Sequence, residues 1–467
     1  MSNLGSIYSC LPIPLQHASC TLQGWRIRLG RFGGEFPTLR REVMLRDSWS
    51  ADRLIDFRNQ RLRTFVQYCA SIPFYDRRFR DAGVDPASIR ELDDLKRLPL
   101  LSKAEVRRAI KEFSGLRSRV GSSAIAAHTS GTTGGGLRFV TSERAVREQW
   151  ATWWRYRERF GLRPGIWQAY FGGRSIVPIG QDRPPFWRWN PALSQWMFSV
   201  YHLSPQNLDS YLEELRSRQI PWLHGYPSAL ALLAARVLER GHPVYQPRWV
   251  TTGAESLLPQ QKTLLHKAFG VIPRQHYGMA EAVANISECE SGALHVDEDF
   301  AAVEFLPSPD GSGFKVVGTN FTNLLTPLLR YEIGDMVSLG RTSCECGFGG
   351  RVVQTIDGRQ EDYVVLGNGA RIGRLDHVFK DMLSIQQAQI YQQIPGAIIV
   401  YIVRGNDYSP DAEHTLLLEL RQRLGEETKI DIQYRDALDR SGAGKLRFVV
   451  SDLPEGRLLS HAERNAG

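Results

Sequence analysis

The sequence contains no run of about 18 apolar residues, and this absence excludes a membrane-spanning helix. It also contains no block of basic residues, because its net charge of +8 is spread along the chain. That spread argues against a nucleic-acid-binding arm. Residues 1–16 lack the basic flank and the continuous apolar stretch of a signal peptide, so we expect a cytoplasmic location.

Cysteine is also scarce, since six residues among 467 do not make a disulfide framework. Cys289, Cys344 and Cys346 lie in two short segments, and His295 follows the first of them closely. Three thiolates and one imidazole can fill all four positions around a tetrahedral zinc ion. These residues therefore predict a structural zinc site that joins two loops. The alternative is a group of buried, reduced cysteines, because Cys344-x-Cys346 lacks the spacing of a Cys-x2-Cys knuckle.

The chain is long for a single hydrophobic core, because such cores seldom exceed about 250–300 residues. Its hydrophobic content of 42% is that of a folded protein, so we expect two domains. The spacing of apolar residues predicts helices over residues 49–70 and 142–160. Ser102 is typical of a helix N-cap, which predicts a further helix directly after it.

Four short apolar segments end in glycine-containing turns, at residues 168–173, 221–225, 248–253 and 274–278. We expect helices directly after the last three, which gives a largely parallel α/β sheet. Ligands of such sheets bind at the carboxyl ends of the strands, where these turns lie. A strand-rich part is expected over residues 301–353, and a domain boundary near residues 357–362.

A segment of glycines and hydroxyl side chains, Ser130-Gly131-Thr132-Thr133-Gly134-Gly135-Gly136, is a candidate phosphate-binding loop. Its backbone N–H groups and hydroxyls can point at phosphate oxygens. It is not a P-loop, because no lysine follows the glycines. The alternative is a plain hairpin turn, since Phe139 and Val140 are typical strand residues.

With these motifs in this order, the chain resembles the adenylate-forming superfamily, and within it the phenylacetate:CoA ligase family and its relatives in capsular polysaccharide biosynthesis. The likeness covers nearly the whole chain. It rests on Pro73-Phe74-Tyr75, the Ser130 loop, Tyr277-Gly278-Met279-Ala280-Glu281, Arg330-Tyr331-Glu332-Ile333-Gly334-Asp335, Asp357-Gly358-Arg359 and Gly444-Lys445. Phe171-Gly172-Gly173-Arg174 and His224-Gly225-Tyr226-Pro227-Ser228 are similar to the polysaccharide-associated branch.

The resemblance implies an α/β fold with a large N-terminal adenylate-forming domain, residues 1–358, whose parallel-rich sheets and helices bind ATP and the acyl substrate. It also implies a small, mobile α+β C-terminal lid domain over residues 359–467. In the implied reaction, a carboxylic acid attacks ATP to give acyl-AMP and pyrophosphate, and an acceptor then displaces AMP. The acceptor is left open between coenzyme A, a carrier-protein thiol, an amine and a sugar hydroxyl.

The resemblance further implies roles for individual residues. Those implied to bind the nucleotide are Ser130, Gly131, Thr132, Thr133, Gly134, Gly253, Ala254, Glu255, Tyr277, Gly278, Met279, Ala280, Asp335 and Arg359. Those implied to be catalytic are Lys445, Glu281, Thr132 and Arg359. Glu281 would hold Mg²⁺, Asp335 would accept both ribose hydroxyls, and Lys445 would swing into the site with the lid.

The acyl pocket is implied near Arg174, His224, Tyr226, Pro227 and Ser228, although His224 and Tyr226 are equally compatible with core positions. The expected partners are a small carboxylic acid and its acceptor, with no nucleic acid, and a homodimer is left open.

The chain departs from its relatives at two places. Gly135 and Gly136 stand where lysine and proline are common, and Glu361 stands where aspartate is usual. The departure at Gly135 and Gly136 slightly favours a catalytically inactive, nucleotide-binding scaffold protein of the same fold. Retention of Glu281 and Lys445, which a pure binder does not need, favours an enzyme.

Overall fold

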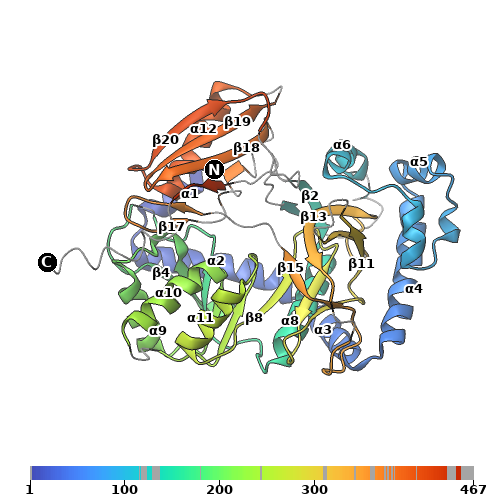
Figure 1. Ribbon diagram of the computed structural model, residues 1–467, viewed down its shortest axis with the longest axis horizontal. Helices are drawn as coiled ribbons and strands as arrows, with labels where there is room; N and C mark the ends of the chain where they lie inside the picture. Colours follow the sequence, from blue (N-terminus) through green and yellow to red (C-terminus); the bar gives the residue numbers. More distant parts are fainter. Residues whose placement is uncertain are drawn as a thin grey trace.

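The structure is a computed structural model (Figure 1). It describes residues 3–453 except 115, 117–123, 129–136, 179, 242–244, 309–312, 341–342, 358–362, 373–374, 376–377, 380–381, 383, 406–407 and 439–448. A large N-terminal part built on two sheets carries a smaller C-terminal part at one end (Figure 1). The mixed α/β class expected from the sequence is confirmed. The exact boundary between the parts stays a prediction, because residues 358–362 lie outside those described.

The central sheet has nine strands in the order β14-β10-β9-β8-β7-β6-β3-β5-β4. Their bounds are β3 Gln168–Gly172, β4 Trp187–Asn190, β5 Gln195–Ser199, β6 Trp222–Gly225, β7 Trp249–Thr252, β8 Arg274–Gly278, β9 Asn285–Glu288, β10 Leu294–Val296 and β14 Val352–Val353. The middle strands β5, β3, β6, β7 and β8 are parallel, and antiparallel strands flank them on both sides. The parallel-rich sheet expected from the glycine-containing turns is therefore confirmed.

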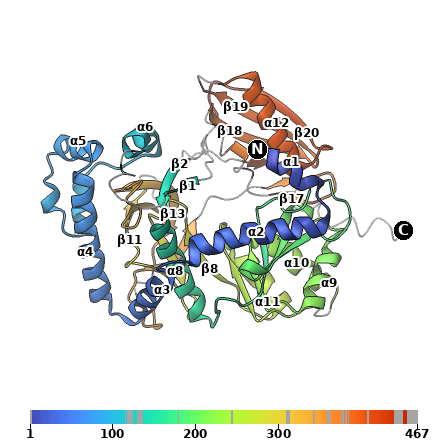
Figure 2. The ribbon, with the colours of Figure 1, turned by 180° about the vertical axis from the view of Figure 1, so that it is seen from behind.

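Helices cover both faces of this sheet. Helices α9 Leu208–Arg218, α10 Pro227–Glu239 and α11 Pro259–Phe269 pack on one face, where Phe171, Leu223 and Val250 join their buried leucines in one core. Helices α2 Ile13–Phe32, α3 Phe36–Leu45 and α8 Glu143–Arg159 lie on the other, which Figure 2 shows from behind. The predicted helix over 142–160 is confirmed, and the Ser142 hydroxyl caps it by accepting a hydrogen bond from the Ala145 N–H.

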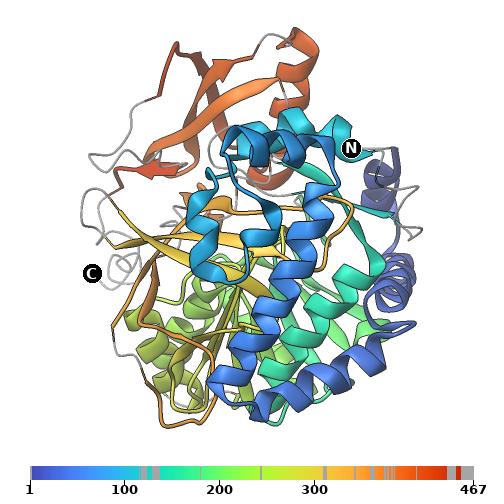
Figure 3. The same cartoon turned by 90° about the vertical axis from the view of Figure 1, so that its right-hand side faces the viewer.

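A second, antiparallel sheet lies beside the first. Its strands are β11 Ala301–Pro307, β12 Phe314–Asn320, β13 Tyr331–Ser338 and β15 Thr355–Asp357. Helices α4 Ala51–Ala70, α5 Pro73–Asp81 and α6 Lys103–Ser114 stand on its outer side (Figure 3). Both the predicted helix over 49–70 and the helix after Ser102 are confirmed. The Ser102 hydroxyl donates to the Glu105 carboxylate over 2.6 Å, and Glu105 N–H bonds back to it.

Strands β1 Ala124–His128 and β2 Arg138–Ser142 form an antiparallel hairpin on either side of the candidate phosphate loop. The strands that the hairpin alternative required are thus present. Residues 129–136 themselves, and so the predicted role of Ser130 to Gly134, lie outside the described part of the chain.

One expectation about the central sheet is wrong. No helix follows β8, because the chain turns at Ala282, which has a positive φ of 54°, and returns as the antiparallel strand β9. Every residue from Glu281 to Cys289 is buried, so this segment runs inside the protein. A short buried strand and a buried helical turn have the same apolar pattern in sequence, which explains the error. After β7 a helix does follow, but it begins only at Pro259.

The C-terminal part has the predicted α+β composition. Its sheet has the order β20-β19-β18-β21, with β18 Ile385–Ile394, β19 Ala397–Arg404, β20 Lys429–Tyr434 and β21 Val449–Ser451. Helix α12 Pro410–Leu424 packs on it through Leu416, Leu420 and Leu424. A small ribbon, β16 Val364–Val365 and β17 Arg371–Ile372, precedes this sheet, and helix α1 Asn3–Cys10 lies beside it in both views (Figures 1 and 2).

Candidate active site

A hydrogen bond joins the two sheets at the centre of the candidate site. Tyr277, near the end of β8, donates its hydroxyl to Asp335 Oδ2 over 2.7 Å. Asp335 lies on β13 and follows Gly334, whose φ of 90° is a conformation that glycine adopts easily. Both side chains are only partly buried. The structure thus brings together the two residues predicted to contact the adenine and the ribose.

The turn after β7 contacts the segment predicted to line the acyl pocket. Glu255 Oε2 accepts a hydrogen bond from the Ser228 N–H over 3.2 Å, at the first turn of α10. Ala254 has a φ of 68°, and this left-handed residue turns the chain away from the sheet between Gly253 and Glu255. The predicted nucleotide loop and the predicted acyl segment are therefore neighbours.

The turn after β3 joins the same group of strand ends. Tyr226 OH accepts a hydrogen bond from the Gly173 N–H over 2.9 Å. A Cβ atom at position 173 would lie 2.5 Å from this hydroxyl, so a larger residue there would have to displace the Tyr226 hydroxyl. Arg174, the next residue, is exposed, whereas Pro227 is buried at the start of α10.

His224 is held on the sheet face that α8 covers. Its Nδ1 lies 2.8 Å from Thr251 Oγ1, which also accepts a hydrogen bond from the Trp222 indole. Burial lowers the pKa of His224 well below its ordinary value, and the charge of Arg157 lowers it further. The imidazole is therefore neutral near pH 7, and it remains partly exposed.

Glu281 is buried, with 9% of its surface exposed, and it does not begin a helix. Asn320 Nδ2 donates to its carbonyl oxygen over 3.2 Å, and Gln149 Nε2 donates to the Met279 carbonyl over 2.7 Å. These bonds hold the segment after Tyr277 between α8 and β12. Glu281 is therefore not a solvated residue at the start of a helix, while its magnesium role stays a prediction.

Three further predicted site residues lie outside the described residues. They are Thr132 in the candidate phosphate loop, Arg359 at the expected domain boundary and Lys445 near the C-terminus. Their roles stay predictions.

The four predicted zinc ligands come together. The ligand atoms of Cys289, His295, Cys344 and Cys346 all lie within 4.8 Å of one another. Cys289 Sγ is 3.7 Å from Cys344 Sγ, and Cys346 Sγ is 3.3 Å from His295 Nε2. Zinc–ligand bonds of about 2.0–2.3 Å in a tetrahedron place ligand atoms about 3.3–3.8 Å apart, so these separations suit zinc.

The surroundings of His295 also suit a metal ligand. Its Nδ1 lies 2.8 Å from the Gly350 carbonyl oxygen, which orients Nε2 toward the thiols. Cys346 Sγ accepts a hydrogen bond from the Phe348 N–H over 3.5 Å. Four protein ligands leave no open position, which is typical of a structural site.

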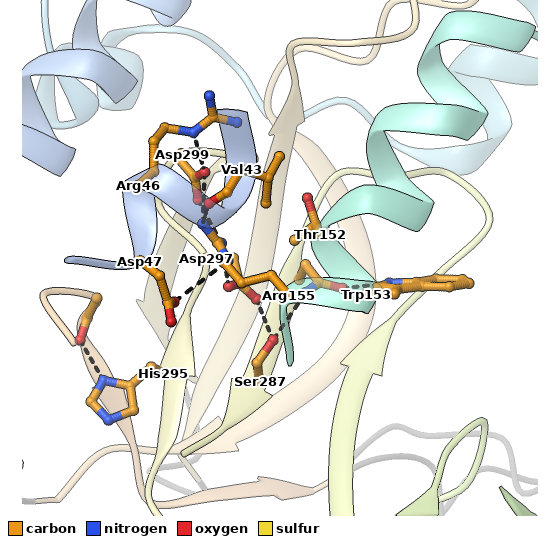
Figure 4. A network of polar contacts seen from close by, with 12 residues as sticks. Val43, Arg46, Asp47, Thr152, Trp153, Arg155, Ser287, His295, Asp297 and Asp299 are labelled. Carbon is orange, nitrogen blue, oxygen red and sulfur yellow. Dashed lines mark hydrogen bonds and ion pairs between the residues drawn. The ribbon is translucent and has the colours of Figure 1, made fainter. Parts of the chain in front are cut away.

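A buried ionic network surrounds Arg155 of α8 (Figure 4). Arg155 of α8 is fully buried and bonds Asp297 over 2.6 Å and Asp299 over 2.8 Å, while Arg46 contacts Asp299 over 2.7 Å. The two arginines hold the pKa of Asp299 well below its ordinary value despite burial. The network thus joins α8 to the segment that follows β10.

The same network reaches the turn after β8. Asn285 Nδ2 donates to Asp297 Oδ2 over 2.6 Å, and the Trp153 indole donates to Asn285 Oδ1 over 2.8 Å. Trp153 in turn lies 5.3 Å from the His276 ring, centroid to centroid. The position of α8 relative to β8 is therefore set by polar contacts as well as by packing.

Reasoning from the sequence missed three residues, Arg157, Arg31 and His276. They lie near one another on the side of the central sheet that α8 covers, and His276 is beside Gly253. Burial lowers the pKa of His276 to about 3, and the charge of Arg157 contributes to this shift. A signal was present: Arg157 follows Trp150, Trp153 and Trp154 at helical spacing, so it falls on the buried side of α8.

The chain is similar to several known proteins. Residues 365–452 match the CapK C-terminal domain family. Protein CapK from Staphylococcus aureus is 26% identical over 462 residues, which is 96% of this chain and 100% of that protein. Phenylacetate-coenzyme A ligase from Thermus thermophilus is 25% identical over 346 residues, covering 68% of this chain and 72% of that protein.

Solved structures show the same fold. A 2-hydroxyisobutyryl-CoA ligase in complex with 2-HIB-AMP and CoA aligns with a TM-score of 0.55 at 18% identity, covering 87% of this chain and 91% of that one. Its postadenylation complex aligns with a TM-score of 0.53. In the described part of the present chain, no helix is both long and apolar enough to cross a membrane.

Proposed function

We propose that the chain is an adenylate-forming ligase related to CapK, which activates a carboxylic acid as acyl-AMP, releases pyrophosphate and transfers the acyl group to an acceptor. The observation that carries this proposal is the hydrogen bond between Tyr277 and Asp335 at the ends of the parallel strands. It unites two predicted nucleotide contacts that are distant in sequence.

In this proposal Asp335 accepts hydrogen bonds from the ribose hydroxyls. Tyr277 OH already occupies Asp335 Oδ2 and so orients the carboxylate. An ionised carboxylate has about four acceptor sites, which leaves capacity for both hydroxyls. The Tyr277 ring supplies an apolar face for adenine.

Charge on the α-phosphate must be stabilised as the acid attacks it. The Ser130 loop would supply N–H and hydroxyl donors to the phosphates, and Lys445 and Arg359 would supply positive charge. Glu281 fits a magnesium role in its buried position near the strand ends. Mg²⁺ supplies charge neutralisation on phosphate oxygens when bound.

We assign a structural role to the zinc site. Its loops lead into β10 and β14, which pair His295 with Val352 at the edge of the central sheet. Zinc would tie this edge together at a distance from the reaction.

The acceptor is proposed to be coenzyme A, with a carrier-protein thiol, an amine or a sugar hydroxyl as alternatives. The phenylacetate-coenzyme A ligase likeness supports the first. The cytoplasmic location stays a prediction from the sequence, and the homodimer stays open.

The test is ATP–pyrophosphate exchange with Mg²⁺ across a panel of aromatic, fatty, hydroxy and dicarboxylic acids, with each acid omitted in turn. Exchange that depends on one acid would support adenylation. Binding of ATP without exchange for any acid would contradict it and favour the scaffold alternative.

A further inference from the structure

Helix α8 directs two buried arginines to opposite sides. Arg155 is 0% exposed and pairs with Asp297 and Asp299. Arg157, two residues later, is 4% exposed and forms no ion pair with any residue that the structure describes. Residues two apart on a helix point in very different directions, so the same helix carries one buried arginine with carboxylate partners and one without them among the described residues.

Arg157 lies among indole rings. Its guanidinium carbon is 5.5 Å from the ring of Trp150, 5.2 Å from Trp154 and 5.3 Å from Trp222. Its Nε is buried and has no hydrogen-bond partner. Burial lowers the pKa of Arg157 to about 10, so the group is still charged near pH 7. Contacts with aromatic faces offset only part of the cost of burying a charge.

A second arginine shares this environment. Arg31 is a residue of α2, and its guanidinium carbon is 4.2 Å from the Trp150 ring centroid. Burial lowers the pKa of Arg31 to about 10, and repulsion from Arg174 and Arg157 contributes. Within the described ranges Arg31 also has no carboxylate partner. A buried cation, Arg157, and a partly exposed one, Arg31, repel each other and share one aromatic environment.

This cluster adjoins the candidate nucleotide site. Tyr170, His224 and Thr251 lie opposite one another on parallel strands, so their side chains share the face that α8 covers. His276 belongs to the same face, and its Nδ1 is buried without a hydrogen-bond partner. Its Cε1 would lie 3.4 Å from a Cβ at Gly253, in the predicted nucleotide loop.

Several members of the cluster remain partly accessible although core surrounds them. They are Arg31, Trp150, Trp153, Tyr170, His224 and His276. His276 faces this cluster, whereas the next residue, Tyr277, reaches Asp335. His276 therefore connects the arginine cluster with the predicted nucleotide loop at Gly253.

We propose that Arg157 and Arg31 bind a second carboxylate of the acid substrate, which makes the substrate a dicarboxylic acid. This inference rests on the proposed function. One carboxylate is activated at the nucleotide, and the other forms charge-assisted hydrogen bonds with the guanidinium groups. An acid with an apolar end would leave both guanidinium groups without a carboxylate partner, so the part of their desolvation cost that the aromatic rings do not offset would remain.

The test is isothermal titration calorimetry without nucleotide, so that its result does not depend on adenylation. The probes are the dicarboxylic acids from succinate to suberate and terephthalate, each compared with its monomethyl ester. We expect at least one diacid to bind about tenfold or more tightly than its ester. Arg157→Gln and Arg31→Gln should remove this difference, and Arg157→Lys should retain part of it.

The control is Arg163→Gln, because Arg163 is largely exposed in the loop after α8 and should leave the preference unchanged. Circular dichroism compares the folding of each variant, and Arg31 provides a second, less buried position if Arg157→Gln does not fold. Equal binding of every diacid and its ester, or a preference that both glutamine variants retain, would overturn the inference.

Exchange assays separate this inference from the proposed function. Exchange with a monocarboxylic acid, combined with no diacid preference, would overturn the dicarboxylate subsite and leave adenylation intact. An Arg157-dependent diacid preference without exchange for any acid would support the subsite and contradict the ligase proposal.

Discussion

The hydroxyl of Tyr277 lies 2.7 Å from Asp335 Oδ2, and this single bond spans two separate sheets. Tyr277 comes from the end of a parallel strand and Asp335 from an antiparallel one. A nucleotide bound at this junction would contact both sheets, so its affinity depends on how the large part of the protein is assembled.

Asp335→Asn should weaken nucleotide binding with little effect on folding. The change replaces two carboxylate acceptors by one carbonyl and a donor, so the ribose hydroxyls lose charge-assisted bonds. We expect the KM for ATP in the exchange assay to rise about tenfold or more. Glu332→Gln, on the same strand, is the matched control. An unchanged KM in the Asp335 variant would remove that residue from the nucleotide site.

Arg155→Met should destabilise the protein strongly. The substitution leaves Asp297 and Asp299 buried with fewer cationic partners. Breaking one side of a buried ion pair costs about 3–5 kcal/mol of unfolding free energy. Urea unfolding measures the loss, and Arg163→Met in the exposed loop after α8 should cost far less. Similar midpoints for the two variants would show that the network contributes little.

The same network predicts how stability changes with acid. The folded-state pKa of Asp299 lies well below that of the unfolded chain, which is about 3.9. A lowered folded pKa stabilises the protein fully above the unfolded pKa, and this contribution is lost as pH falls through the folded value. Unfolding free energy should therefore decrease below about pH 5, more steeply in the wild type than in Asp299→Asn. Equal slopes would contradict the assignment.

The helices and strand ends that depend on residues close together in the sequence were predictable. The apolar spacing of α4 and α8 and the glycine turns after β3, β6 and β7 identified helices and strand ends. Contacts between distant segments were harder to predict. Trp150 and Trp153 lie at helical spacing in the sequence, yet both are partly exposed around an arginine that the same spacing places beside them.

The zinc cluster shows where this limit lies. The sequence identified all four ligands, because thiols and an imidazole in short loops are a chemical signal. That the loops meet depends on the pairing of His295 with Val352 between β10 and β14, which no local pattern records. The prediction of a helix after β8 was wrong for the same reason. The segment there is held by contacts with distant residues, such as the bonds of Asn285 to Trp153 and Asp297.

Protein purified without added metal should contain about one equivalent of zinc per chain, as expected for a closed four-ligand site. Cys344→Ser should lower the zinc content and the thermal midpoint together, because the metal joins two loops. Cys10→Ser, at an exposed cysteine, should change neither. Elemental analysis and thermal unfolding measure both quantities. Zinc far below one equivalent in the wild type would contradict the site.

Lys445→Ala should separate binding from chemistry. The lysine is predicted to reach the reacting carboxylate and α-phosphate only when the C-terminal part closes, so its charge stabilises the transition state. We therefore expect exchange to be lost while the dissociation constant for ATP changes little.

Lys429→Ala is the matched control for this variant, because Lys429 is an exposed lysine on β20 of the same C-terminal part and should retain full exchange. Exchange and equilibrium binding of ATP are measured on both proteins. If Lys445→Ala kept exchange at the level of Lys429→Ala, the lysine would have no part in adenylation. If both variants lost it, the loss would reflect damage to the C-terminal part rather than one missing charge.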